Sequence, residues 1–182
     1  MPPLSLLHEK RNAKSPSILI FLQFAIIAYA IVSGVFLAFS DFIMRSLGRT
    51  SGTGGVEAMQ VINREVFRWV FMTLFIGMAP VSLLIAAYGG FMLGDGPGML
   101  MAIAGFIYII GCFGVTIVFN VPMNEALARM DASSADAQDY WSKTYLPRWT
   151  VWNSVRTVAC AVSAALLLFG LFLLTQNAAP SV

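Results

Sequence analysis

Long uninterrupted runs of apolar residues dominate the chain and predict four membrane-spanning helices. A bilayer-spanning helix needs roughly 20 consecutive apolar residues. Stretches of about that length occur at Ile18–Phe39, Trp69–Leu93, Met99–Phe119 and Thr157–Thr175. A transmembrane β-barrel would instead alternate polar and apolar residues within segments of about ten. The pattern therefore predicts an all-α fold, an integral membrane four-helix bundle.

The segments between these runs indicate how the helices connect. Residues 94–98 read Gly-Asp-Gly-Pro-Gly and are dense in turn formers, so the second and third helices form an antiparallel hairpin. The connections Arg45–Arg68 and Asn120–Arg156 hold nearly all the remaining charge. We expect a short interfacial helix in each of them. In a four-pass bundle both connections lie on the same side of the membrane.

The domain boundaries follow from the same pattern. We expect a polar tail over residues 1–17, a four-transmembrane-helix domain over 18–176 and a short tail over 177–182. The first apolar run passes Ala28-Tyr29-Ala30, which resembles a signal-peptidase site, but it continues to Phe39 and is long for a removable signal. We therefore expect a multi-pass integral membrane protein. The charge count leaves the orientation open, because Arg residues buried in a site do not report on topology.

Composition narrows the possible functions. The chain is 58% hydrophobic and 11% charged, whereas soluble domains carry about 25% charged residues. A net charge of +2 with dispersed Lys and Arg gives no reason to expect a nucleic-acid partner. The single histidine, His8, lies in the tail, which excludes His-ligated haem and His-rich metal sites, so we expect no metal and no cofactor. Cys112 and Cys160 lie inside apolar runs and are expected to serve packing.

Polar residues recur at helical spacing where each helix meets the long connections. Residues three and four apart share one helix face. The four rows are Gly34, Ala38, Asp41 and Arg45; Gln60, Asn63, Arg64 and Phe67; Thr116, Asn120 and Asn124; and Trp149, Trp152, Asn153 and Arg156. Asn is costly near hydrocarbon unless it has a partner. The rows therefore predict either a functional pocket or a structural hydrogen-bond network, while Trp141 and Tyr145 are interpreted as interfacial anchors.

The same residues carry a family resemblance. The strings GVFLAFSDFIMRSLGR, GVEAMQVINREV, FGVTIVFNVPMNEALARM and YLPRWTVWNSVRTVAC span roughly residues 34–165. Their most specific parts are the Asn120-Val121-Pro122-Met123-Asn124 sequence and the spacing of Trp149, Trp152, Asn153, Arg156 and Thr157. These strings resemble the anthrone oxygenase-like family of small four-pass membrane proteins, a domain of unknown function in bacteria. The resemblance implies a location in the bacterial inner membrane. The family's named activity is the oxidation of anthrones to anthraquinones by fungal members.

The resemblance implies a membrane-embedded, cofactor-independent oxygenase-like enzyme, a monooxygenase among the oxidoreductases, acting on a lipophilic aromatic compound of the anthrone or quinol type. Removing the acidic C–H proton of an anthrone gives an anion that can pass an electron to dioxygen. Asp41 or Glu65 would be the base, and Arg64 and Arg156 would hold the oxyanion. The substrate-binding residues would be Asn63, Asn120, Asn124, Trp149, Trp152 and Asn153.

A second function class stays open at this point. The chain can equally be a non-catalytic membrane protein whose polar network is structural, or which binds a lipid or a partner protein. Each carboxylate can then be the salt-bridge partner of a neighbouring Arg. The expected partners are membrane lipid and, under the enzyme hypothesis, a lipophilic aromatic small molecule. The oligomeric state is not predicted.

Overall fold

The computed structural model describes residues 15–176, and this part of the chain is helical with no strand. Within it, four helices are long and apolar enough to cross a membrane: Pro16–Leu47, Val70–Leu93, Gly96–Ala128 and Ala135–Gln176. The predicted all-α bundle of four long helices is thereby confirmed. His8, the C-terminal tail and most of the N-terminal tail fall outside the described residues.

Each of the four long helices combines α-helical and π-helical segments. The bounds are α2 Pro16–Ala38, η1 Phe39–Ile43, α3 Met44–Leu47, α4 Gly54–Glu65, α5 Val70–Ala87, η2 Tyr88–Leu93, α6 Gly96–Ile107, η3 Tyr108–Gly114, η4 Thr116–Asn120, α7 Val121–Ala128, α8 Ala135–Tyr140, η5 Trp141–Tyr145 and α9 Leu146–Gln176. The η segments are π-helical. Such turns are rare and occur frequently at functional sites, because the wider turn changes which residues share a face.

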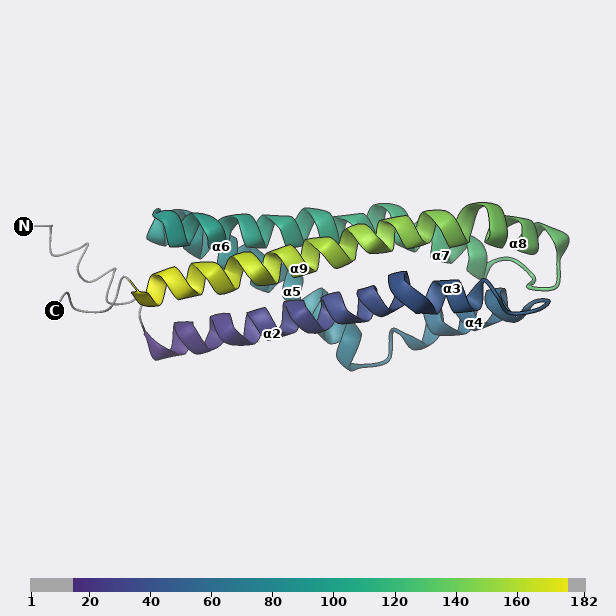
Figure 1. Ribbon diagram of the computed structural model, residues 1–182, viewed down its shortest axis with the longest axis horizontal. Coiled ribbons are helices and arrows are strands. Elements are labelled where there is room, and N and C mark those ends of the chain that lie inside the picture. The colour runs from purple at the N-terminus through teal and green to yellow at the C-terminus, as the bar shows by residue number, and fades with distance from the viewer. Residues whose placement is uncertain (1–14, 177–182) are drawn as a thin grey trace, which may run out of the picture.

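The bundle is elongated (Figure 1). Three helical stretches run along the whole bundle: α2 to α3, α6 to α7, and α8 to α9. By contrast, α5 covers only the half of the bundle that contains the α5–α6 turn. The short helix α4 lies with α3, α7 and α8 at the other end, which we call the head. The helix Ala135–Gln176 has 42 residues, so it is about 63 Å long at 1.5 Å per residue. A hydrocarbon core is about 30 Å thick, so the head extends beyond it.

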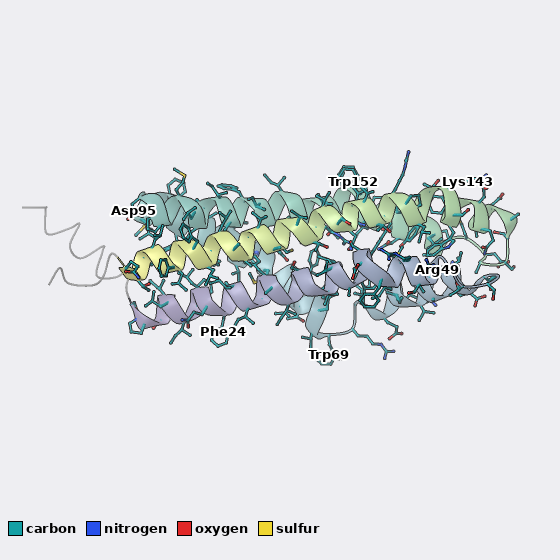
Figure 2. The ribbon with its side chains drawn as sticks, in the orientation of Figure 1. Phe24, Arg49, Trp69, Asp95, Lys143 and Trp152 are labelled. Atoms are coloured by element: carbon teal, nitrogen blue, oxygen red, sulfur yellow. The ribbon has the colours of Figure 1, made fainter. Side chains whose placement is uncertain are left out.

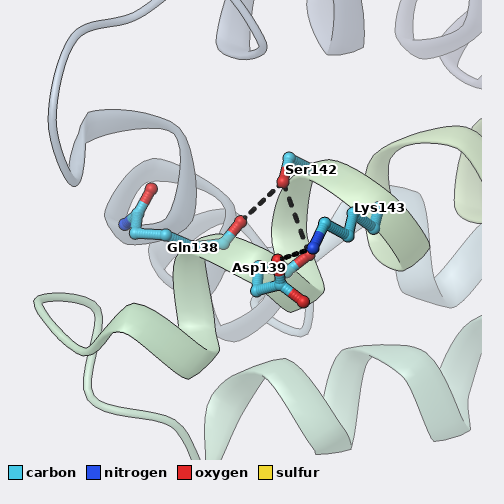
Figure 3. Close-up of polar contacts among 4 residues, drawn as sticks. All are labelled: Gln138, Asp139, Ser142 and Lys143. Atoms are coloured by element: carbon cyan, nitrogen blue, oxygen red, sulfur yellow. Dashed lines mark hydrogen bonds and ion pairs between the residues drawn. The ribbon is translucent and has the colours of Figure 1, made fainter.

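The surface agrees with this division into two halves. Figure 2 shows Arg49 and Lys143 at the head and Asp95 at the opposite end, with Phe24 on the apolar surface between them. On α8 and η5, Lys143 forms an ion pair with Asp139 one turn earlier (Figure 3). Beside it, the Ser142 hydroxyl donates to the backbone carbonyls of Gln138 at 2.9 Å and Asp139 at 3.4 Å. Exposed pairs of this kind suit a helix surface in water.

The third connection is much shorter than the sequence predicted. The expected connection Asn120–Arg156 is almost entirely helical, and only residues 129–134 separate α7 from α8. The Ser134 hydroxyl caps α8 by accepting from the Ala137 N–H at 3.1 Å. Hydropathy ends a predicted span at polar residues, but helical hydrogen bonds continue regardless of them. Short helices do occur in both connections, and their interfacial position stays a prediction.

The predicted hairpin joins α5 and α6 through a tight turn. Gly94 follows η2 with a φ of +62°, a left-handed conformation that suits glycine. The Asp95 carboxylate then caps α6 by accepting from the Gly98 N–H at 3.1 Å. A Cβ atom on Gly105 would lie 2.3 Å from the Ser82 carbonyl oxygen. The two backbones therefore approach as closely as small residues allow.

This close approach gives a stability prediction. Gly105→Ala should lower the free energy of unfolding in detergent by roughly 1–3 kcal/mol, because α5 and α6 must separate to admit the methyl group. Gly77→Ala, in open space on α5, is the matched control and should cost nothing. Thermal unfolding followed by tryptophan fluorescence compares the two variants. Equal midpoints would show that the hairpin does not depend on the contact.

Candidate functional site

A cavity of about 300 Å³ lies where two apolar cores meet. The first core fills the half of the bundle away from the head and includes Phe36 and Phe75. The second core fills the head; it consists of Met44, Val56, Met59, Leu127, Trp141, Tyr145 and Trp149. Residues from both cores line the cavity, and α2, α4, α5, α7 and α9 all contribute to its walls.

The cavity walls are mainly aromatic and aliphatic. Their aromatic members are Phe36, Phe39, Phe67, Phe71, Phe75, Phe113 and Trp149. Phe36 meets Phe71 edge-on with a centroid distance of 5.5 Å, and Phe75 lies 5.6 Å from Phe113. Polar groups in the lining come from Asn63, Thr116, Asn124 and Arg156. An apolar pocket with a few convergent polar groups is the usual form of a small-molecule site.

Arg156 is the charged residue of the cavity wall, and it is 4% exposed. Its guanidinium carbon lies 4.1 Å from the centre of the Phe36 ring and 5.2 Å from the Trp149 ring. Nη2 donates to the Asn153 side-chain oxygen at 2.6 Å and Nη1 to the Thr116 hydroxyl at 3.3 Å, whereas Nε has no partner. The ion pairs among residues 15–176 lie on the surface and none includes Arg156. This buried cation therefore lacks a carboxylate, which is energetically costly.

Asn153 positions Arg156 by tying α9 to α2 and η1. Its Nδ2 donates to the Phe36 carbonyl oxygen at 2.6 Å and to the Ser40 hydroxyl at 2.6 Å. Its Oδ1 accepts from Arg156. The residue is fully buried. It acts on the cavity through Arg156, because it is not itself part of the lining.

A second network holds the wall of the cavity that faces the head. The Asn124 side-chain oxygen accepts from the Tyr145 hydroxyl at 2.7 Å and from the Trp149 indole N–H at 2.8 Å. Asn63 donates to the Tyr145 hydroxyl at 3.2 Å. Asn120 donates to the Trp149 carbonyl at 3.3 Å, and its own side-chain oxygen is buried without a partner. Tyr145 is buried in the head, as is Trp141, so their interpretation as interfacial anchors was wrong.

Six predicted site residues lie outside the cavity lining: Asn120 and Asn153, described above, and Asp41, Arg64, Glu65 and Trp152. Asp41 and Arg64 are exposed, and Glu65 forms an exposed ion pair with Arg68 at 2.9 Å. Trp152 stacks on Phe119 with a centroid distance of 3.6 Å. The catalytic roles suggested for Asp41, Glu65 and Arg64 stay predictions, and no carboxylate is among the described residues that line the cavity.

Sequence reasoning missed most of the aromatic wall. Phe36, Phe71, Phe75 and Phe113 sit in continuous apolar runs, where hydropathy does not tell a cavity face from a lipid face. Thr116 belonged to a predicted row, and its spacing of four from Asn120 was the available signal. The polar rows thus supply part of the cavity lining, but they did not indicate which face of each helix carries the cavity.

The donor groups of the site suit a carbonyl oxygen or an oxyanion. Guanidinium, amide and hydroxyl groups offer N–H and O–H donors, whereas metal ions prefer thiolate, imidazole or carboxylate ligands. Among residues 15–176, no three His, Cys, Asp or Glu side chains come together. Cys112 and Cys160 are fully buried, and their sulfur atoms lie 3.1 Å apart. Cys112 is one helical turn from Thr116, and Cys160 is one helical turn from Arg156.

Comparison with known proteins places the chain in a family. A family model described as anthrone oxygenase matches residues 69–166, more than half of the sequence. The chain therefore belongs to the anthrone oxygenase family, which confirms the resemblance of its motifs. No curated protein and no solved structure matches it. The matched region contains Thr116, Asn124, Trp149 and Arg156, whereas the walls from α2 and α4 lie outside it.

The unpaired charge of Arg156 gives a prediction that separates a ligand site from a structural network. Arg156→Met should change the free energy of unfolding by less than about 1 kcal/mol, because removal of a buried charge without a carboxylate offsets the donor that the Asn153 side-chain oxygen loses. Asn153→Ala should lower it by roughly 1–3 kcal/mol, because the Arg156 guanidinium loses an acceptor and the Phe36 carbonyl a donor. Thermal and denaturant unfolding in detergent measure both effects. A loss for Arg156→Met as large as that for Asn153→Ala would favour the structural network.

Proposed function

We propose that this member of the anthrone oxygenase family is a membrane-embedded, cofactor-independent oxygenase that acts on a lipophilic aromatic compound of the anthrone or quinol type and converts an anthrone to the anthraquinone. The observation that carries the proposal is Arg156, a buried cation without a carboxylate at the wall of an aromatic cavity. A ligand that develops negative charge there would supply the missing anion. Family membership alone would not define the reaction, because one fold can host several functions.

The shape of the cavity supports a flat aromatic substrate. Phe36, Phe71 and Phe75 form one aromatic group, and Trp149 belongs to the cavity wall nearest the head. Aromatic rings favour offset or edge-on contacts with other rings and add to the stabilisation from burial. A substrate of two or three fused rings can pack here with its oxygen directed at Arg156.

The chemistry begins with the acidity of the substrate. An anthrone carries a CH₂ group between two aromatic rings and opposite a carbonyl group. A base, for which the sequence suggests Asp41 or Glu65, takes one CH₂ proton. The electron pair moves toward the carbonyl oxygen and gives a phenolate-like anion. Arg156 donates N–H bonds to that oxygen, and its charge is most effective in a site that excludes water. The anion is thus stabilised more than the neutral ketone, which lowers the barrier to proton loss.

Dioxygen then oxidises the anion. One electron passes from the anion to dioxygen, and the resulting carbon radical and superoxide combine, with uptake of a proton, to a hydroperoxide on the former CH₂ carbon. Removal of the second proton from that carbon breaks the O–O bond and leaves a carbonyl group and water. The four electrons lost by the CH₂ group reduce one dioxygen, so that one oxygen atom enters the quinone and the other leaves as water. The substrate supplies all of the reducing electrons in this scheme.

This reaction gives a direct activity prediction. Purified protein in liposomes should consume one dioxygen per anthrone, and ¹⁸O₂ should place one labelled oxygen in the anthraquinone. Arg156→Met should lower kcat/KM by about 10²–10³-fold, the usual effect of losing an oxyanion donor. Arg148→Met, which removes an exposed cation from the same helix, is the matched control. Oxygen uptake and product absorbance are measured against protein-free liposomes.

Two further variants test the bases suggested by the sequence. Asp41→Asn and Glu65→Gln should keep most of the activity if the cavity lining alone holds the reacting atoms, because neither carboxylate belongs to that lining. A loss as large as that of Arg156→Met would assign a catalytic role to the carboxylate instead. Oxidation no faster than in protein-free liposomes, for anthrones and quinols alike, would refute the proposed function.

A further inference from the structure

The cavity has a mouth on the side of the bundle. Three of its lining residues have large exposed fractions: 67% for Phe67, 52% for Ile76 and 53% for Ile117. They come from the turn between α4 and α5, from α5 and from η4. In this region α5 packs against α2, α6 and η3, while η4 packs mainly against α9 and α7. The mouth therefore lies between α5 and η4, which have little contact with each other.

The surface around the mouth is apolar on the sides of α5 and η4, whereas the exposed ion pair of Arg68 and Glu65 lies beside Phe67 in the chain. Val118, next to Ile117, is 61% exposed, and Trp69 and Val70 are exposed at the start of α5. Ile76 and Ile117 belong to two of the helices that are long and apolar enough to cross a membrane. An exposed apolar surface on such helices faces lipid. The mouth thus opens toward the bilayer, near the level where α5 begins.

We propose that the ligand reaches Arg156 from the bilayer through a lateral portal formed by Phe67, Ile76 and Ile117, in its neutral form, and becomes an anion only inside the cavity. The choice of an aromatic ketone or phenol as ligand rests on the proposed function. The portal residues offer no hydrogen bond to an anion, and Arg156 is the charged residue of the lining. A charged ligand would lose its hydration at the portal before it gained a partner.

The two parts of the route therefore select for different properties. The lateral portal admits compounds that dissolve in hydrocarbon, and Arg156 retains those that can place negative charge on an oxygen. A weakly acidic, uncharged aromatic compound meets both conditions. A permanently charged compound with the same rings meets only the second condition.

Binding of a product-like probe tests the portal without turnover. The probe is 1-hydroxyanthraquinone, which already carries both quinone carbonyls, and stopped-flow quenching of tryptophan fluorescence follows its binding to the protein in phosphatidylcholine liposomes. The double variant Ile76→Phe/Ile117→Phe narrows the portal and should slow association by about tenfold or more. The matched control Leu83→Phe/Ile110→Phe adds the same bulk at exposed positions outside the lining and should bind at the wild-type rate. Ile76→Ala/Ile117→Ala widens the portal and should bind at least as fast as wild type.

Two relatives of the probe distinguish the bilayer from water as its source. An anthraquinone with a long alkyl chain stays in the bilayer and should still bind. Anthraquinone-2-sulfonate stays in water and should not bind, although its negative charge matches Arg156. Binding of the sulfonate as fast as the neutral probe would overturn the proposal. Equal association rates for the narrowed variant and its matched control would also overturn it.

The outcome is independent of the proposed reaction. Slow binding to the narrowed variant together with no anthrone oxidation would support the lateral portal and refute the oxygenase function. Anthrone oxidation together with equal binding rates would support the function and refute the portal.

Discussion

The burial of Arg156 is the constraint around which the site is arranged. Its guanidinium lies at the junction of α2, η4 and α9, where Phe36 and Trp149 present their ring faces and Thr116 and Asn153 accept its hydrogen bonds. Cation–π contacts and neutral acceptors offset part of the cost of desolvating a charge, but they do not replace a carboxylate. A ligand that brings an oxyanion can therefore gain more here than at a neutral site. The two cores meet at this point without closing over it, which leaves the cavity open.

Helix geometry explains which parts of the site could be predicted from the sequence. On α9, the regular spacing of Trp149, Asn153 and Arg156 places the three residues on one face, as predicted. The row through Asp41 lies on another face of this helix: Gly34, before η1, and Asp41 are exposed, whereas Phe36 and Phe39 line the cavity. Hydropathy was sufficient for four spans and for the hairpin. Hydropathy could not show that the long helix ending with α9 begins at Ala135. Polar residues in the head lower the hydropathy there, but they do not interrupt the backbone hydrogen bonds of the helix.

The aromatic wall could not be predicted because of the bilayer itself. In a soluble protein, polarity separates the inward face of a helix from the outward face, but in a membrane both faces are apolar. Phe71 and Phe75 therefore look like any lipid-facing residues in the sequence, although they line the cavity. At Tyr145 the sequence misled in the other direction. Tyrosine is a typical interfacial anchor, but this side chain is buried in the head and forms hydrogen bonds with Asn63 and Asn124. Contacts between distant helices, and not local composition, decide these positions.

The match to the anthrone oxygenase family covers only some of the cavity walls. The walls inside and outside the match contribute different groups to the site. The groups that would hold an oxyanion, Arg156 and Thr116, lie inside the matched residues 69–166. Met59 and Phe36 lie outside them and form walls that a ligand must fit. Family membership therefore bears on the type of reaction through the first group. It bears on the size and outline of the cavity only in part, because the α5 walls Phe71 and Phe75 lie inside the match, whereas the walls from α2 and α4 lie outside it.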